Sequence, residues 1–232
     1  MTLSPRISLG VAALLVATAL TAQADEPVRI AESQELGWRA VGRLDVAGGP
    51  SCTATLISDR AALTAAHCVI DRLTGAPLRP VQITLRAGLR YGRAAGAQRA
   101  QTLALWPRDR PFEACAAGLA AIGFSAPFDA DRIAAFDVGG DAQTLSLAGY
   151  GPWSPGAPTV ESGCSLSGAA EAARLTGCAA APGAALIAEA AGRRALVAVV
   201  SADDRCGPEA ARALPVAPHL ADLLDALATA PR

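Results

Sequence analysis

Short apolar segments, separated by glycine, proline and charged residues, run through most of the chain. Residues 81–85 alternate between apolar and polar side chains, which is the period-two pattern of a half-buried strand. Residues 102–105 form a further apolar segment that ends before Pro107, and residues 195–202 form a longer one. Several short strands with turn signals between them predict an all-β domain.

The pattern changes its period near the C-terminus. Leu220, Leu223, Leu224 and Leu227 recur at i, i+3, i+4 and i+7 after Pro218. This spacing is typical of an amphipathic helix whose apolar side packs on the rest of the domain. We predict this helix over about residues 218–228.

The first 24 residues have the three-part pattern of an export signal. Arg6 is their basic residue, the apolar stretch 9–20 is too short to cross a bilayer, and Ala22-Gln23-Ala24 is a typical cleavage site. We therefore predict a signal peptide over residues 1–24 and a secreted or periplasmic protein. Residues 25–232 fit one domain and contain no further membrane-spanning stretch, so no membrane contact is expected after signal cleavage.

The cysteine and histidine content bounds the chemistry. All six cysteines lie after residue 24, and an even number in an oxidising compartment predicts three disulfides. The chain has no C-x-x-C motif, and its two histidines are His67 and His219. We therefore expect no metal site and no other cofactor. His219 begins the predicted helix and is interpreted as a surface or capping residue.

The charge pattern excludes two classes of function. The formal net charge is -1, and every basic residue is an arginine. A protein that binds nucleic acid or a membrane surface needs a basic stripe, which this chain lacks, so neither partner is expected. The arginine-rich stretch 86–93 is interpreted as a solvated turn.

Two neighbouring stretches carry the strongest signal for chemistry. Residues 51–57 read Ser-Cys-Thr-Ala-Thr-Leu-Ile, and residues 63–68 read Leu-Thr-Ala-Ala-His-Cys, a buried strand followed by a turn that ends in His67 and Cys68. With Cys52 upstream, this combination resembles the trypsin-like serine peptidases. Residues 118–128 and Gly149-Tyr150-Gly151 resemble later parts of the same family, so the resemblance covers most of the mature chain.

The resemblance implies a fold. It is all-β, with two six-stranded antiparallel β-barrels and a C-terminal α-helix that closes the second barrel. The first barrel would cover about residues 37–130, the second about 135–215 and the helix about 218–228. A monomer is expected.

The resemblance also implies how the cysteines pair. Cys52 would bond to Cys68 and hold the histidine turn against the neighbouring strand, and Cys164 would bond to Cys178. Cys115 and Cys206 would then form the third pair. A second scheme, found in animal relatives, joins Cys178 to Cys206 and Cys115 to Cys164.

The triad that such a peptidase needs is incomplete in this sequence. The serine attacks, the histidine takes its proton, and a buried aspartate orients the imidazole. His67 is the histidine that the resemblance implies, but Gly118 stands in the position of the aspartate. Glu113 is the nearest upstream carboxylate, and an irregular strand would be needed to bring it under His67.

The serine is missing as well. The family has Gly-Asp-Ser-Gly shortly after a cysteine, whereas residues 178–186 contain no serine. Read without gaps, Ala185 stands in the position of the serine; read with a gap that keeps Ser201 on its usual strand, the Asp-Ser-Gly triplet is deleted. Ser167, which precedes Gly168, is the alternative nucleophile.

These departures predict a secreted homologue that has lost peptidase activity and binds an extended peptide or a protein partner. The resemblance implies that Ser201, Ala202 and Asp203 form the substrate-binding strand. A peptide would add to residues 199–202 by β-augmentation. The alternative is an active serine endopeptidase with a displaced nucleophile loop.

Overall fold

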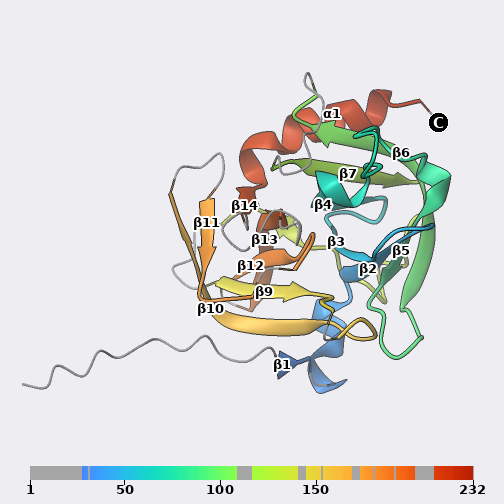
Figure 1. Ribbon diagram of the computed structural model, residues 1–232. Coiled ribbons are helices and arrows are strands. Elements are labelled where there is room, and N and C mark those ends of the chain that lie inside the picture. Colours follow the sequence, from blue (N-terminus) through green and yellow to red (C-terminus); the bar gives the residue numbers. More distant parts are fainter. Residues whose placement is uncertain are drawn as a thin grey trace, which may run out of the picture.

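The computed structural model describes residues 28–30, 32–108, 117–140, 145–152, 154–168, 173–179, 181–190, 192–201 and 212–231. Two closed antiparallel β-barrels of six strands each and a C-terminal helix make up the fold, as the resemblance implied (Figure 1). The predicted signal peptide lies outside the described residues. So do the side chains of Glu113, Cys115, Ala202, Asp203 and Cys206.

The first barrel closes in the order β2-β3-β4-β7-β6-β5. Its strands are β2 (Val41–Val46), β3 (Cys52–Leu56), β4 (Ala61–Ala65), β5 (Ile83–Ala87), β6 (Gly96–Trp106) and β7 (Leu119–Phe124). β3, β4 and β7 are buried along their whole length, and the three threonines among them, Thr53, Thr55 and Thr64, are buried as well.

The strand predicted at residues 81–85 begins two residues later than expected. Pro80, Val81 and Gln82 form the 3-10 helix η3 (Pro80–Gln82), and β5 starts at Ile83. Proline at the first position favours a helical turn because its ring fixes φ near the helical value. Val81 is consequently 60% exposed, and the buried positions of this strand are Ile83, Leu85 and Ala87.

The second barrel closes in the order β9-β10-β11-β14-β13-β12, since β10 also pairs with β9. Its strands are β9 (Leu145–Gly149), β10 (Thr159–Ser167), β11 (Ala173–Thr176), β12 (Ala185–Ala190), β13 (Arg193–Ser201) and β14 (Arg212–Pro215). Two short strands extend the sheet: β1 (Val28–Arg29) pairs with β10, and β8 (Asp137–Val138) pairs with β13.

An N-terminal 3-10 helix, η1 (Glu32–Trp38), connects β1 to the first barrel. Arg194 on β13 holds the end of η1, because its guanidinium donates to the carbonyl of Gly37 at 3.2 Å and lies over the Trp38 ring, 4.4 Å from the centroid. The buried Trp38 ring is thus covered by a cation from the second barrel.

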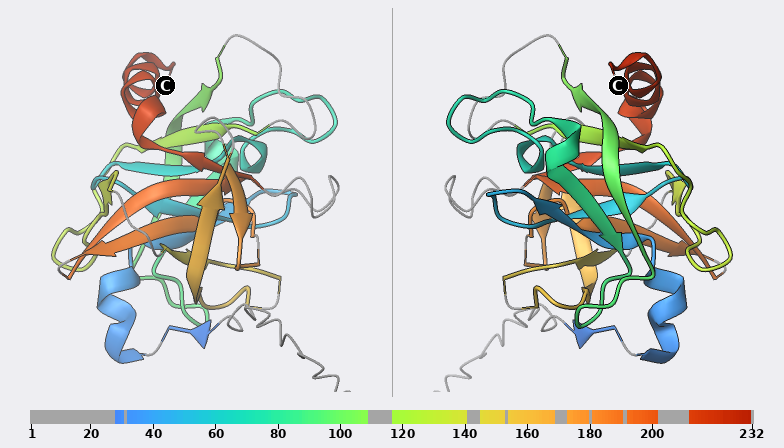
Figure 2. Two further views of the ribbon diagram at one scale, coloured as in Figure 1. Left: turned by 90° about the vertical axis from the view of Figure 1, so that its left-hand side faces the viewer. Right: turned by 90° about the vertical axis from the view of Figure 1, so that its right-hand side faces the viewer.

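The C-terminal helix α1 (Leu220–Thr229) is present, but the expectation that it closes the second barrel is wrong. It packs on β6 and β7 of the first barrel, and Figure 2 shows it beside the long strand β6. Leu227 of the helix packs over Gly123 on β7, where a Cβ would lie 3.4 Å from its side chain. In the preceding turn η6 (Ala217–His219), the His219 ring stacks on Trp106 with 3.7 Å between centroids, so His219 is part of this packing.

Candidate active site

His67 lies in a short helical turn, η2 (Ala66–Cys68), that follows β4 directly. The Ala66 N–H donates to the carbonyl of Gly118 at 2.8 Å, and a disulfide joins Cys68 to Cys52 on β3. The turn is therefore fixed to both strands that neighbour β4 in the barrel, and His67 is only 8% exposed. The predicted Cys52–Cys68 disulfide is confirmed.

Gly118 lies beside this turn. It immediately precedes β7, whose first residue Leu119 pairs with Ala65. The backbone hydrogen bond to Ala66 places it next to His67, where the resemblance puts the aspartate. Glycine supplies no carboxylate at this position.

Ser201 is a described residue whose side chain contacts the imidazole. It ends β13, is 7% exposed, and its Oγ lies 3.5 Å from His67 Nδ1. This distance exceeds that of a strong O–H···N hydrogen bond, so the contact orients the ring without binding it tightly. The sequence placed Ser201 on the substrate-binding strand; its contact with His67 is an additional role.

The turn before β12 is fixed between the two barrels. Thr53 N donates to the carbonyl of Pro182 at 2.9 Å, and Gly183 N donates to the carbonyl of Val200 at 2.9 Å. Thr53 follows Cys52, whose disulfide partner Cys68 is next to His67, and Val200 precedes Ser201, which contacts His67. The turn at Pro182 and Gly183 is therefore bonded to β3 on one side and to β13 on the other.

Gly183 is required in this turn for two reasons. Its φ is +74°, a value that residues with a side chain rarely adopt. A Cβ atom here would also lie 2.1 Å from the carbonyl oxygen of Thr53 and 2.6 Å from Thr64 Oγ1. The Pro-Gly pair was the sequence signal for this turn. Because alanines surround it, the sequence did not show which residue takes the position of the nucleophile.

Thr53 connects the turn to the rest of the seam between the barrels. Its carbonyl accepts the hydroxyl of Thr64 at 2.7 Å, and its own hydroxyl oxygen accepts the N–H of Tyr150 at 2.8 Å. The Tyr150 hydroxyl in turn donates to the carbonyl of Leu89 at 2.9 Å, and burial raises the pKa of this phenol. Sequence reasoning missed Thr53 because a threonine in a strand carries no special signal.

Neither Ala185, which the sequence puts in the position of the serine, nor the alternative nucleophile Ser167 lies in this turn. Ala185 is the first residue of β12, is fully buried, and pairs with Ala148 and Val199 inside the sheet. Ser167 is the last residue of β10, is exposed, and pairs with Arg174 in the β10–β11 hairpin.

The strand expected to receive a peptide is already paired. Val199 pairs with Ala185 on one side and with Leu214 on the other. Val200 pairs with Ala213, and its N–H and carbonyl also bond to the backbone of residues 184 and 183. The expectation of β-augmentation at these two residues is therefore wrong, because the hydrogen bonds that a peptide would need are taken.

A second disulfide joins β10 to the segment that follows β11. Cys164 is bonded to Cys178, as predicted, which excludes the alternative scheme in which each pairs with another cysteine. The proposed partners Cys115 and Cys206 lie outside the described residues.

A buried carboxylate lies next to this disulfide. Glu161 on β10 is 4% exposed, and its Oε2 accepts the N–H of Ala179 at 2.7 Å. Burial raises the pKa of Glu161, and the hydrogen bond from Ala179 opposes the rise. Glu161 thus holds the start of the segment that leads to Pro182.

We predict that Glu161→Gln stabilises the protein at neutral pH. The pKa is higher in the folded state, so its contribution to stability is complete below the unfolded value of about 4.3 and is lost as the pH rises through the folded value. Glutamine keeps a carbonyl for Ala179 and carries no charge. Urea unfolding from pH 4 to 8 should show the advantage of the variant growing with pH. In the control Asp222→Asn, at an exposed carboxylate of α1, the difference should stay small; a flat difference in Glu161→Gln would contradict the prediction.

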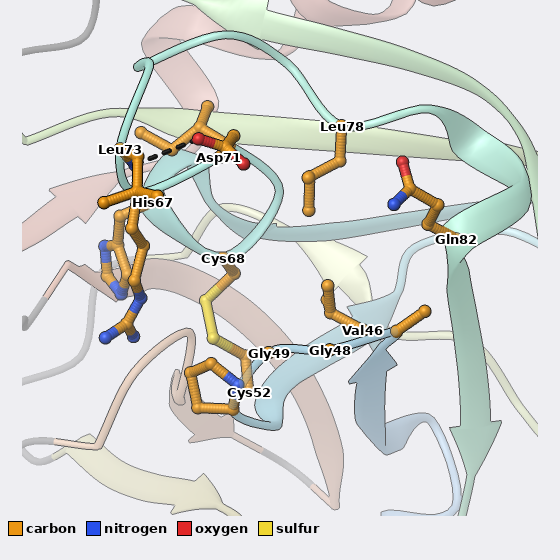
Figure 3. A pocket seen from close by; sticks show the side chains of 14 residues that line it. Val46, Gly48, Gly49, Cys52, His67, Cys68, Asp71, Leu73, Leu78 and Gln82 are labelled. Atoms are coloured by element: carbon orange, nitrogen blue, oxygen red, sulfur yellow. Dashed lines mark hydrogen bonds between the residues drawn. A yellow bond between two sulfur atoms is a disulfide. The ribbon is translucent and has the colours of Figure 1, made fainter.

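A cavity of about 260 Å³ opens beside His67 (Figure 3). Its walls are the turn around Gly48 and Gly49, the Cys52–Cys68 disulfide, and the loop from Ile70 to Leu78. All the lining residues belong to the first barrel.

The atoms of Cys52, His67 and Cys68 that could bind a metal lie within 4.8 Å of one another. Both sulfurs are used in the disulfide, however, and a metal needs thiolates. This cluster therefore fits a structural disulfide rather than a metal centre.

Comparisons with known proteins agree with the fold of two β-barrels. Residues 27–103 match the trypsin family. A scabies mite inactivated protease paralogue, S-D1, is 14% identical with a TM-score of 0.67, and the match covers 87% of this chain and 96% of the paralogue. A Glu endopeptidase solved with MPD is 18% identical with a TM-score of 0.68, and the match covers 90% of this chain and 100% of the endopeptidase.

No curated protein matches the chain. The two solved structures show the fold, and the family match covers the stretch from β1 through the histidine turn into β6. This chain therefore matches the trypsin family in sequence over residues 27–103 and shares its fold of two β-barrels with the two solved structures.

Proposed function

We propose that this chain is an exported trypsin-like protein without peptidase activity, which acts by binding a peptide or protein partner. The observation that carries the proposal is the turn at Pro182 and Gly183. It is fixed between β3 and β13 beside His67, and no residue from Cys178 to Ile187 carries a hydroxyl group.

Pro182 occupies the place of the nucleophile in this account. The residue that attacks must sit in a turn next to the histidine, and two hydrogen bonds support Pro182 in that position: Thr53 N–H to the carbonyl of Pro182, and Gly183 N–H to the carbonyl of Val200. Proline has neither a nucleophilic side chain nor a backbone N–H. The usual donor for the negatively charged oxygen of the intermediate is therefore lost together with the serine.

The missing carboxylate at Gly118 removes a second contribution. In serine peptidases, the aspartate holds the imidazole in the productive tautomer and stabilises its charged form. The glycine at position 118 supplies no negative charge for this purpose. Loss of the triad leaves such enzymes with only about 10³ to 10⁴ over water, and loss of an oxyanion donor costs roughly 10² to 10³ more.

One observation favours a second candidate function. Ser201 and His67 form a serine–histidine pair, which would give weak hydrolysis if Ser201 itself attacked a substrate. Against it, Ser201 is buried and faces Nδ1, and the residue beside the histidine turn that would supply the carboxylate is Gly118.

Export is part of the proposal. The signal-like residues 1–24 support it, and two disulfides within a trypsin-like fold fit an extracellular protein. In the part of the chain that the structure describes, no helix has the length and apolar character needed to cross a membrane.

The experiment is a comparison of His67→Ala and Ser201→Ala with the unchanged protein. We expect all three to hydrolyse casein and small esters no faster than buffer. His67→Ala should lower the free energy of unfolding by roughly 1 to 3 kcal/mol, because alanine lacks the packing and the polar interactions of the imidazole. Measurable hydrolysis that disappears in both variants would establish the second candidate function and overturn the first.

A further inference from the structure

The cavity beside His67 combines a cation that has no partner among the described residues and an exposed apolar side chain. Arg72 and Leu73 line it together with His67 and the disulfide. Its volume is about 260 Å³. That is enough for one amino-acid residue of moderate size.

Arg72 is the cation that can still take a partner. No hydrogen bond or ion pair engages its guanidinium in the described part of the chain. The other charge in the loop, Asp71, is already used: its Oδ1 accepts the N–H of Leu73 at 3.0 Å, and the N–H and hydroxyl of Thr74 at 2.8 and 3.0 Å. These bonds lower the pKa of Asp71 and keep its charge turned toward its own loop.

Leu73 forms the apolar part of the cavity rim. Its side chain is 96% exposed, the highest value among the large apolar residues described. The hydrogen bond from its N–H to Asp71 fixes the backbone, so the side chain is held out beside the cavity before any ligand arrives. In Figure 3, Leu73 and His67 lie at one end of the cavity and Gln82 lies at the other.

We propose that this cavity binds the C-terminal residue of a peptide that ends in an apolar side chain. The terminal carboxylate would pair with Arg72, because a guanidinium and a carboxylate form charge-assisted hydrogen bonds. The apolar side chain would pack against Leu73 and the disulfide. This inference rests on the proposed binding function and replaces the strand at Val199 and Val200, which is already paired, as the place of contact.

The test is an NMR titration of the ¹⁵N-labelled protein with acetyl-Ala-Ala-Ala-Leu, as the free acid and as the C-terminal amide. We expect the acid to shift amide signals in the loop around Leu73 and the turn around Gly48. Loss of the charged pair, in the amide or in Arg72→Gln, should weaken binding about tenfold or more. The matched control is Arg99→Gln, at an exposed arginine on β6 outside the cavity, which should bind like the unchanged protein.

The apolar contact has its own pair of variants. Leu73→Ser should weaken binding of the acid about fivefold to tenfold, and Leu36→Ser, at an exposed leucine of η1, should not. Equal binding of acid and amide, no binding of either, or shifts confined to other parts of the protein would overturn the inference. These results concern binding alone. The proposed lack of peptidase activity is tested separately by the hydrolysis assay.

Discussion

Gly183→Ala is expected to destabilise the protein by about 3 kcal/mol or more, because two costs coincide at one residue. The new Cβ would lie 2.1 Å from the carbonyl oxygen of Thr53, which is backbone and cannot move without disturbing β3. The φ of +74° adds strain for any residue with a side chain. Urea unfolding monitored by tryptophan fluorescence measures the effect.

Gly156→Ala is the matched control. No heavy atom lies within 4 Å of the place its Cβ would take, and its φ is outside the left-handed region. This change should leave stability unchanged or raise it slightly. If Gly183→Ala unfolded at the same urea concentration as Gly156→Ala, the turn would not be clamped between β3 and β13 as described.

The second large effect is a gain of function. Gly118→Asp combined with Pro182→Ser returns a carboxylate beside the histidine turn and a hydroxyl and N–H to the clamped turn. We expect this double variant to hydrolyse p-nitrophenyl acetate on the order of 10² to 10³ times faster than the unchanged protein. Triad residues act as a unit, so each single variant should gain far less.

The His67→Ala change in this background is the control for mechanism. It should remove the gain, because the new serine then has no base. Ala185→Ser tests the other register: it places a hydroxyl in the interior of β12, where we expect no activity and some loss of stability. A gain in Ala185→Ser without one in the Pro182→Ser double variant would contradict the assignment of Pro182.

Much of the fold could be predicted because its signals are local. The stretch from Leu63 to Cys68 encodes a buried strand, a tight turn and a disulfide partner within six residues, and the structure has all three. The leucine spacing from Leu220 to Leu227 likewise predicted a helix. It could not predict the surface on which the helix packs, because that surface is formed by β6 and β7, which lie far away in the sequence.

The site was harder to predict where the sequence is repetitive. Between Cys178 and Leu186 the chain is mostly alanine, so residue identity does not fix which position enters the turn. The register is set instead by long-range hydrogen bonds from Thr53 and to Val200. Glu161 gave no signal either, because its partner is a backbone N–H eighteen residues away.

The most direct test of the central claim is labelling of the folded protein with a fluorophosphonate, which reacts only with an activated serine. Intact-mass measurement should show no adduct after long incubation, while the Gly118→Asp, Pro182→Ser double variant should gain one that maps to residue 182. A stoichiometric adduct on the unchanged protein, at Ser201, Ser167 or any other serine, that is absent from His67→Ala would contradict the account and show that the chain is an active serine hydrolase.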